Sequence, residues 1–94
     1  MKQSIELSEE QITIALKLLG VALNRRIQEK GRDSFVNAHE ILGATEVEVA
    51  ELREAVHRKI TIEVISELLD VAVGCVFGVA SLNAYATIGK GEKK

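Results

Sequence analysis

Two pairs of acidic residues in this chain share one spacing. Glu48 and Glu51 form the first pair, and Glu67 and Asp70 form the second. Residues three positions apart project from the same side of a helix, so each pair would present two carboxylates together. Carboxylates gathered in a sheltered place either take up protons or bind a hard divalent cation. Among such cations, ligand sets made only of oxygen favour Mg²⁺, with Mn²⁺ as an alternative.

Both pairs lie on segments that are expected to be helical. Apolar residues recur at intervals of three and four, and polar caps at Ser8 and Asn37 open two of the segments, which predicts helices over about 8–30, 38–57 and 61–86. The chain has no proline and only three aromatic residues, which also favours helices over strands. We therefore predict an all-α fold in a single domain spanning 1–94, with a flexible tail at 89–94.

The two acidic pairs are placed symmetrically about residue 59. Glu48 and Asp70 are equally far from it along the chain, and so are Glu51 and Glu67. If the second and third helices form a long antiparallel hairpin that closes there, Glu48 faces Asp70 and Glu51 faces Glu67. Helix axes about 8–10 Å apart would let all four carboxylates reach one point. The alternative is that these acids are solvated and merely border an apolar seam.

Composition excludes several classes of function. Twelve Lys or Arg against fourteen Asp or Glu give a net charge of −2, so the chain lacks the basic excess of a protein that binds a nucleic acid polymer. The single cysteine, Cys75, has apolar neighbours and is expected to be a buried thiol in a reducing, cytoplasmic setting. Residues 71–89 carry no charge, but glycines and Asn83 dilute the run, so we expect no membrane span.

The third helix is apolar nearly all round outside its acidic residues. Two short helices cannot cover such a surface, so we expect a homo-oligomeric helical bundle, either a dimer or a tetramer. The expected contact runs through Val73, Val76 and Ala80, with Gly74 and Gly78 permitting close approach of the backbones.

The acidic pattern resembles that of the MazG-like superfamily of all-α nucleoside triphosphate pyrophosphohydrolases, in its short, phage-type members. The family pattern is Glu-Glu-x-x-Glu, a gap, and then Glu-x-x-Asp. Here the first motif reads Val47-Glu48-Val49-Ala50-Glu51, and Glu67-Leu68-Leu69-Asp70 follows after fifteen residues. The likeness covers roughly 34–82, and Val47 stands where the family has its first glutamate.

This resemblance implies a function and a set of site residues. Glu48, Glu51, Glu67 and Asp70 would be the metal ligands, and Glu48 or Glu51 would orient the attacking water or accept its proton. The reaction would be the Mg²⁺-dependent hydrolysis of a nucleoside or deoxynucleoside triphosphate to the monophosphate and pyrophosphate. The alternative is a non-catalytic helical oligomer that binds a protein partner or a small nucleotide. Base and sugar preference stay open, as does activity with Val47 in the first motif.

Three further residues are candidates for substrate contacts. Lys17 and Asn24 fall on one stripe of the first helix that could line a cleft, and Phe35 could stack on a base. The alternatives are a solvated helix face for Lys17 and Asn24 and a hydrophobic plug at the start of the second helix for Phe35. Phe77 is expected in the core, and neither histidine has a partner at catalytic spacing.

Overall fold

The computed structural model describes residues 3–88, and these form three α-helices and no strand. The helices are α1 (Glu9–Lys30), α2 (Ala38–Arg58) and α3 (Thr61–Ile88). The predicted all-α class with three helices is confirmed. The second helix ends one residue later than expected and the third ends two residues later. The expected tail at 89–94 lies outside the described residues.

The helix starts follow the caps that the sequence predicts. Ser8 Oγ accepts a hydrogen bond from the Gln11 amide at 3.1 Å, and Gln11 Oε1 accepts one from the Ser8 amide at 2.9 Å. At α2, Asn37 Oδ1 accepts from the Glu40 amide at 3.0 Å. The Glu40 carboxylate accepts a hydrogen bond from the amide of Val36, the residue before Asn37, at 2.6 Å, so it does not form a capping box with the Asn37 amide.

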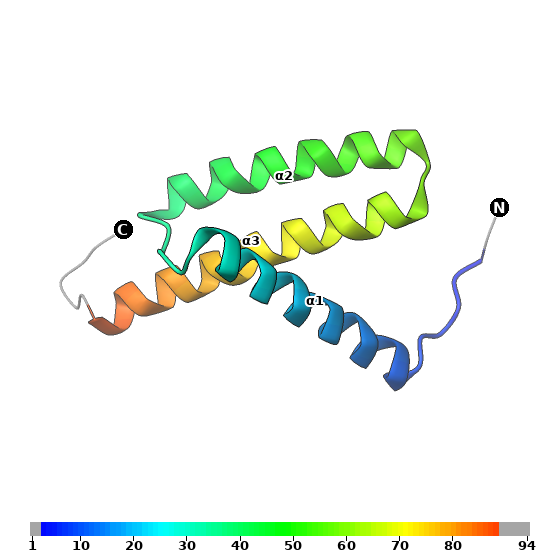
Figure 1. The fold of residues 1–94 in the computed structure, drawn as a ribbon, viewed down its shortest axis with the longest axis horizontal. Coiled ribbons are helices and arrows are strands. Elements are labelled where there is room, and N and C mark those ends of the chain that lie inside the picture. Colours follow the sequence, from blue (N-terminus) through cyan, green and yellow to red (C-terminus); the bar gives the residue numbers. More distant parts are fainter. Residues whose placement is uncertain (1–2, 89–94) are drawn as a thin grey trace.

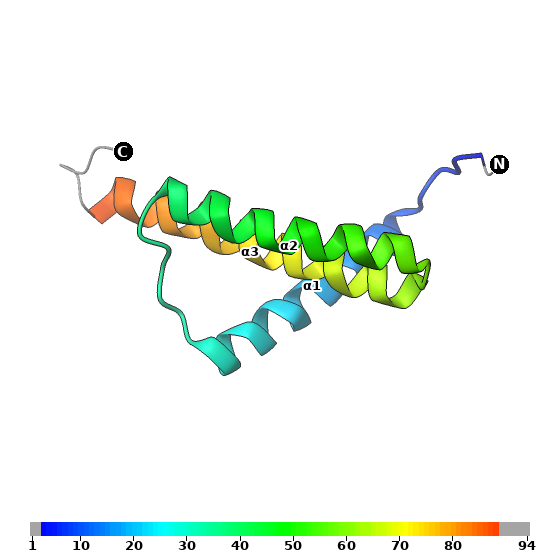
Figure 2. The same cartoon turned by 90° about the horizontal axis from the view of Figure 1, so that it is seen from above.

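The chain reverses between α2 and α3 at Lys59. This residue is in the left-handed region, with φ 60° and ψ 33°, and its amide donates to the carbonyls of Ala55 and Val56. Both views show α2 and α3 side by side after this turn (Figures 1 and 2). A left-handed residue closes the end of a helix without proline, although glycine is the usual choice there.

Small residues allow α2 and α3 to approach closely. Gly78 is buried against Ile41, and a Cβ at Gly78 would lie 3.0 Å from Ile41 Cγ2. Near the turn, Ala55 is fully buried. Gly78, which was expected to face another subunit, therefore packs against α2 of its own chain.

The loop before α2 is fastened to α3 by hydrogen bonds. Ser81 Oγ accepts from the Phe35 amide at 2.9 Å and donates to the Phe77 carbonyl at 2.7 Å. Tyr85 donates to the Phe35 carbonyl at 2.8 Å. Ser81 is only 2% exposed, so these bonds satisfy polar groups that water does not reach. They hold Phe35 in one place relative to α3.

Helix α1 crosses α3 obliquely and packs against it (Figures 1 and 2). Its expected apolar stripe is only partly covered: Leu19, Leu23 and Ile27 are half-buried, whereas Ile12 and Leu16 are 50% and 62% exposed. The reason is the crossing angle, since only the second half of α1 lies close to α3.

The isolated chain is extended and leaves much apolar surface uncovered. Its radius of gyration is 15.7 Å, against about 12 Å for a compact domain of this length. Cys75 is exposed, which contradicts the expected burial. Val73, by contrast, is 5% exposed, so it belongs to the core of the chain and not to the expected contact between subunits. In the described part of the chain, no helix is long and apolar enough to cross a membrane.

We predict that Lys59→Gly stabilises the fold by about 0.5–1 kcal/mol, which is several degrees in Tm. A side chain in the left-handed region costs about 1–2 kcal/mol, and the greater freedom of glycine in the unfolded chain offsets part of the gain. Lys59→Ala is the matched control, because it removes the charge and keeps the Cβ. Thermal unfolding of the three chains measures the effect, and an equal gain in both variants would assign it to charge.

Candidate functional site

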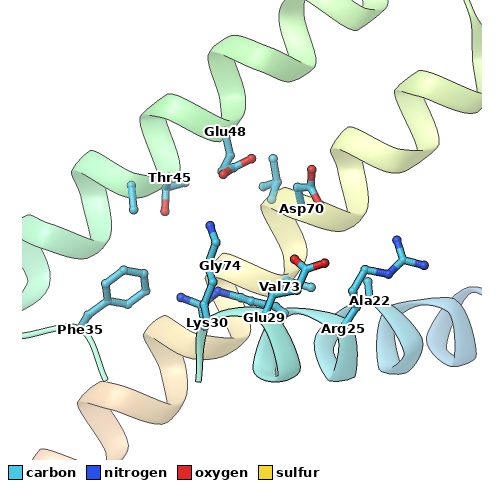
Figure 3. A pocket seen from close by; sticks show the side chains of 13 residues that line it. Ala22, Arg25, Glu29, Lys30, Phe35, Thr45, Glu48, Asp70, Val73 and Gly74 are labelled. Atoms are coloured by element: carbon cyan, nitrogen blue, oxygen red, sulfur yellow. The ribbon is translucent and has the colours of Figure 1, made fainter. Parts of the chain in front are cut away.

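Three carboxylates converge between α2 and α3. Glu48, Glu67 and Asp70 each offer one oxygen, and these three atoms all lie within 4.8 Å of one another. Figure 3 shows Glu48 on α2 and Asp70 on α3 at the same level of the two helices. The reversal at Lys59 produces this level, because the two residues are equally distant from it along the chain.

Glu51 lies beside this triad but does not belong to it. The sequence pattern places it opposite Glu67, whereas in the structure Glu48 meets both Glu67 and Asp70. Glu51 sits one helical turn closer to Lys59 than Glu48 does, and it is exposed. Three of the four expected ligands therefore share a centre, and the fourth, Glu51, is an exposed neighbour of Glu48 beside it.

The environment of Glu48 opposes its ionisation. The residue is half-buried, and its Oε1 is enclosed with no hydrogen-bond partner among residues 3–88. Burial raises the pKa of Glu48 above its ordinary value of 4.5, and the charges of Glu51, Asp70 and Glu67 raise it further. Loss of hydration and repulsion between like charges act in the same direction here.

The environment of Glu67 also opposes its ionisation. It is half-buried, and its Oε1 is likewise enclosed without a hydrogen-bond partner in the part of the chain that the structure describes. Burial raises the pKa of Glu67, Asp70 and Glu51 raise it further, and the positive charge of Arg58 opposes them. Arg58 itself is engaged near the turn, with its Nε 2.7 Å from Glu63 Oε1. Two enclosed oxygens therefore lack a proton donor or cation in the same small volume.

A cavity of about 380 Å³ opens next to Glu48 and Asp70 (Figure 3). Helix α1 forms one wall, α2 and α3 form the other, and the loop before α2 closes one end. Six of the lining residues are charged, three of each sign. Basic side chains come only from α1, and two of the three acidic ones come from the facing wall. The thirteen lining residues are Ala22, Arg25, Arg26, Glu29, Lys30, Phe35, Ala44, Thr45, Glu48, Asp70, Val71, Val73 and Gly74.

The structure separates the expected substrate-binding residues. Phe35 lines the cavity, and its half-buried ring lies at the side of the cavity in Figure 3. Lys17 and Asn24 are exposed and do not line the cavity. The helical stripe that faces the acids is shifted around α1 from the one that the sequence pattern favours.

The residues in that shifted stripe are Arg25, Arg26 and Lys30. The sequence contains a weak indication of this position for Arg26, because Arg26 continues the three-and-four spacing of Leu19 and Ala22, which are half-buried. A basic residue on an otherwise apolar stripe indicates a place where a charge is held against packed surface.

Comparisons of the chain with family models, with curated proteins and with solved structures found no match. The interpretation of the site therefore rests on the arrangement of its own residues.

We predict that Glu48→Gln raises the Tm at pH 7 in the presence of a chelator. A carboxyl group with a raised folded pKa keeps its proton where the unfolded chain has lost it, so its contribution to stability falls as pH rises from 4.5 through the raised value. Glutamine removes this loss. The gain should shrink toward zero as the pH falls to 4.5 and below.

The matched control is Glu46→Gln, on the exposed side of the same helix. Thermal melts of the three proteins between pH 4 and pH 8 measure the effect. A gain from Glu48→Gln that is the same at every pH would contradict the assignment to ionisation.

Proposed function

We propose that this protein is a Mg²⁺-dependent nucleoside triphosphate pyrophosphohydrolase that forms the monophosphate and pyrophosphate. One observation carries the proposal: the carboxylates of Glu48, Glu67 and Asp70 converge at the edge of a cavity whose opposite wall is basic. An acidic centre suits a divalent cation, and a basic wall suits phosphate. A substrate that carries both, a metal-bound triphosphate, matches the two walls together.

The acidic centre has the chemistry that a hard cation requires. All three side chains offer oxygen, and the enclosed Oε1 atoms of Glu48 and Glu67 have no hydrogen-bond partner among the described residues. Ligands at about 2.1 Å in octahedral geometry lie about 3–4 Å apart, so the 4.8 Å group needs only small side-chain rotations to fit Mg²⁺. When bound, the ion would offset the negative charge of the phosphate oxygens and acidify a water molecule.

Glu51 is the residue proposed to orient the attacking water. It lies next to the triad, outside the converging oxygens, and it is exposed. A carboxylate in that position can accept the proton of a water molecule that it holds. We propose Glu51 and not Glu48 for this role, because Glu48 is part of the triad.

The other substrate contacts come from the cavity wall. Phe35 is placed to stack on the base, since its backbone is fastened to α3 and its ring lines the cavity. Lys17 and Asn24 lie outside the cavity, so we do not propose them as substrate contacts.

Pyrophosphate release from a panel of nucleoside triphosphates tests the proposal. We expect pyrophosphate release that depends on Mg²⁺. Glu48→Gln and Asp70→Asn should each reduce the rate of release by about tenfold to a hundredfold or more, because losing even a residue that only supports a metal ligand has an effect of that size. Glu46→Gln is the control on the same helix and should behave like the wild-type chain.

A thermal melt across Mg²⁺ and triphosphate concentrations separates the alternative, a non-catalytic oligomer that binds a nucleotide. A rise in Tm with ligand but no release would favour the binding protein. If the chain shows no rise in Tm and no pyrophosphate release, both the hydrolase and the nucleotide-binding oligomer are overturned.

We also propose that the protein acts as a homo-oligomer whose contact runs along one face of α3. The stripe on that face has spacings of three and four, as in the seam between two packed helices. Its residues are exposed except for Ala72, which is half-buried: Ile65, Leu68, Ala72, Cys75, Val79, Leu82 and Ala86. It lies on the side of α3 opposite Val73 and Phe77, which belong to the core of the chain.

The surface area of the chain supports a second copy as the occupant of this face. The exposed area is 7683 Å², roughly 2,300 Å² more than a compact monomer of this mass exposes. Part of this excess belongs to the extended segment before α1. Obligate dimers bury about 1,000–2,500 Å² on each chain, so the remainder is of the size that one such contact covers.

Cys75 offers a direct test of this contact, because it lies near the middle of the stripe. Whether two α3 helices pair in parallel or in antiparallel, their Cys75 residues come close at the seam, within reach of a disulfide. We predict that mild oxidation gives a dimer on a non-reducing gel, and that Val79→Glu gives a smaller particle by light scattering.

Two controls accompany this test. Glu46→Cys in a Cys75→Ser background places an exposed thiol on α2 and should not cross-link, and Leu42→Glu adds the same charge on α2 and should not change the particle size. A wild-type chain that is monomeric at all concentrations would overturn the proposal.

A further inference from the structure

Arg26 is held in one orientation by an aromatic ring. Its guanidinium carbon lies 3.7 Å from the centroid of the Phe77 ring, and Phe77 is 9% exposed. A guanidinium stacked on a ring keeps its hydrogen-bond donors in a plane parallel to the ring, where they can bind two oxygens of one group. The stacking therefore preorganises the Arg26 guanidinium for ligand binding.

The charge of Arg26 has no anionic partner within 4 Å in the described part of the chain. The side chain is half-buried, and its Nη1 is enclosed with no hydrogen bond. In residues 3–88, the ion pairs within 4 Å are those of Arg58 with Glu54 and Glu63. A half-buried cation without an anion is costly, and because Arg26 lines the cavity, an oxyanion bound in the cavity would offset that cost.

Arg26 lines the same cavity as Glu48 and Asp70, and it does so from the facing wall. Arg25 and Lys30 line that wall as well, and Figure 3 shows Lys30 projecting from α1 toward the side where Glu48 lies. With three basic and three acidic residues, the lining is neutral, and a bound divalent cation would make it +2. That charge complements a diphosphate group.

We propose that Arg26 binds the terminal two phosphates of the substrate, and therefore binds inorganic pyrophosphate as a ligand in its own right. This inference rests on the proposed function, because that function sets which end of the triphosphate lies at the acidic triad and which end lies at Arg26. Glu51 and the acidic triad mark the end of the site where the anhydride bond is broken, and the fixed guanidinium marks the wall that receives the leaving pyrophosphate. The planar fork of arginine matches two phosphate oxygens, which the point charge of a lysine does not.

Calorimetric titration with inorganic pyrophosphate in the presence of Mg²⁺ tests this role. We expect Arg26→Gln to weaken binding by about tenfold or more, the effect of losing a hydrogen-bonded charge. Arg26→Lys keeps the charge and a long apolar stem over Phe77, so it should fold as the wild-type chain does and still bind several-fold more weakly. Lys17→Gln removes a positive charge from the same helix outside the cavity and should bind as the wild-type chain does.

The outcomes separate this inference from the proposed function. Weaker pyrophosphate binding in both Arg26 variants, with no hydrolysis by the wild-type chain, would support the phosphate site and remove the hydrolase. Hydrolysis by the wild-type chain with unchanged pyrophosphate affinity in Arg26→Lys would overturn the inference and keep the hydrolase. Absence of pyrophosphate binding by the wild-type chain, or equal weakening in Lys17→Gln, would also overturn it.

Discussion

The reversal at Lys59 sets the register of α2 against α3, and most of the site depends on that register. Because the left-handed turn is short, residues equally far from it meet across the two helices. Glu48 and Asp70 are each eleven residues from Lys59, and farther from the turn Ile41 packs on Gly78, at eighteen and nineteen residues from it. A slip of one residue would rotate the acidic side chains of one helix by about 100° away from the other.

The same register creates an electrostatic conflict inside the fold. Glu48 and Glu67 each lose hydration and lie close to other carboxylates, so their pKa values are raised and their ionisation opposes folding. A stable helix pair would place apolar residues at these two positions. The arrangement is understandable if a cation completes it, since one divalent charge would convert the repulsion into attraction.

Helix α1 contributes the opposite charge. It approaches α3 with its second half, where Arg26 stacks on Phe77 and the basic side chains face the acidic wall. The open form of the chain also leaves one face of α3 without cover. The uncovered face and the cavity lie on different sides of α3, so a second copy could pack on that face without filling the cavity.

The sequence by itself determined the local features of this protein. Helix positions follow from apolar spacing and from the side chains of Ser8 and Asn37, which act on amides only three residues away. The acidic pairs could be recognised for the same reason, because the spacing within one helix is fixed by its 3.6-residue repeat. The turn at Lys59 could be located by the symmetry of those pairs, although the residue itself gives no glycine or proline signal.

Only the tertiary structure decided which side chains share a space. The exclusion of Glu51 from the triad, the replacement of Lys17 and Asn24 by Arg25 and Arg26 at the cavity, and the exposure of Cys75 all depend on crossing angles between helices. Such angles arise from many weak contacts between residues far apart in the chain, such as Ile41 against Gly78 and Arg26 over Phe77. Periodicity specifies which face of a helix is apolar, but not how far along its length that face is covered.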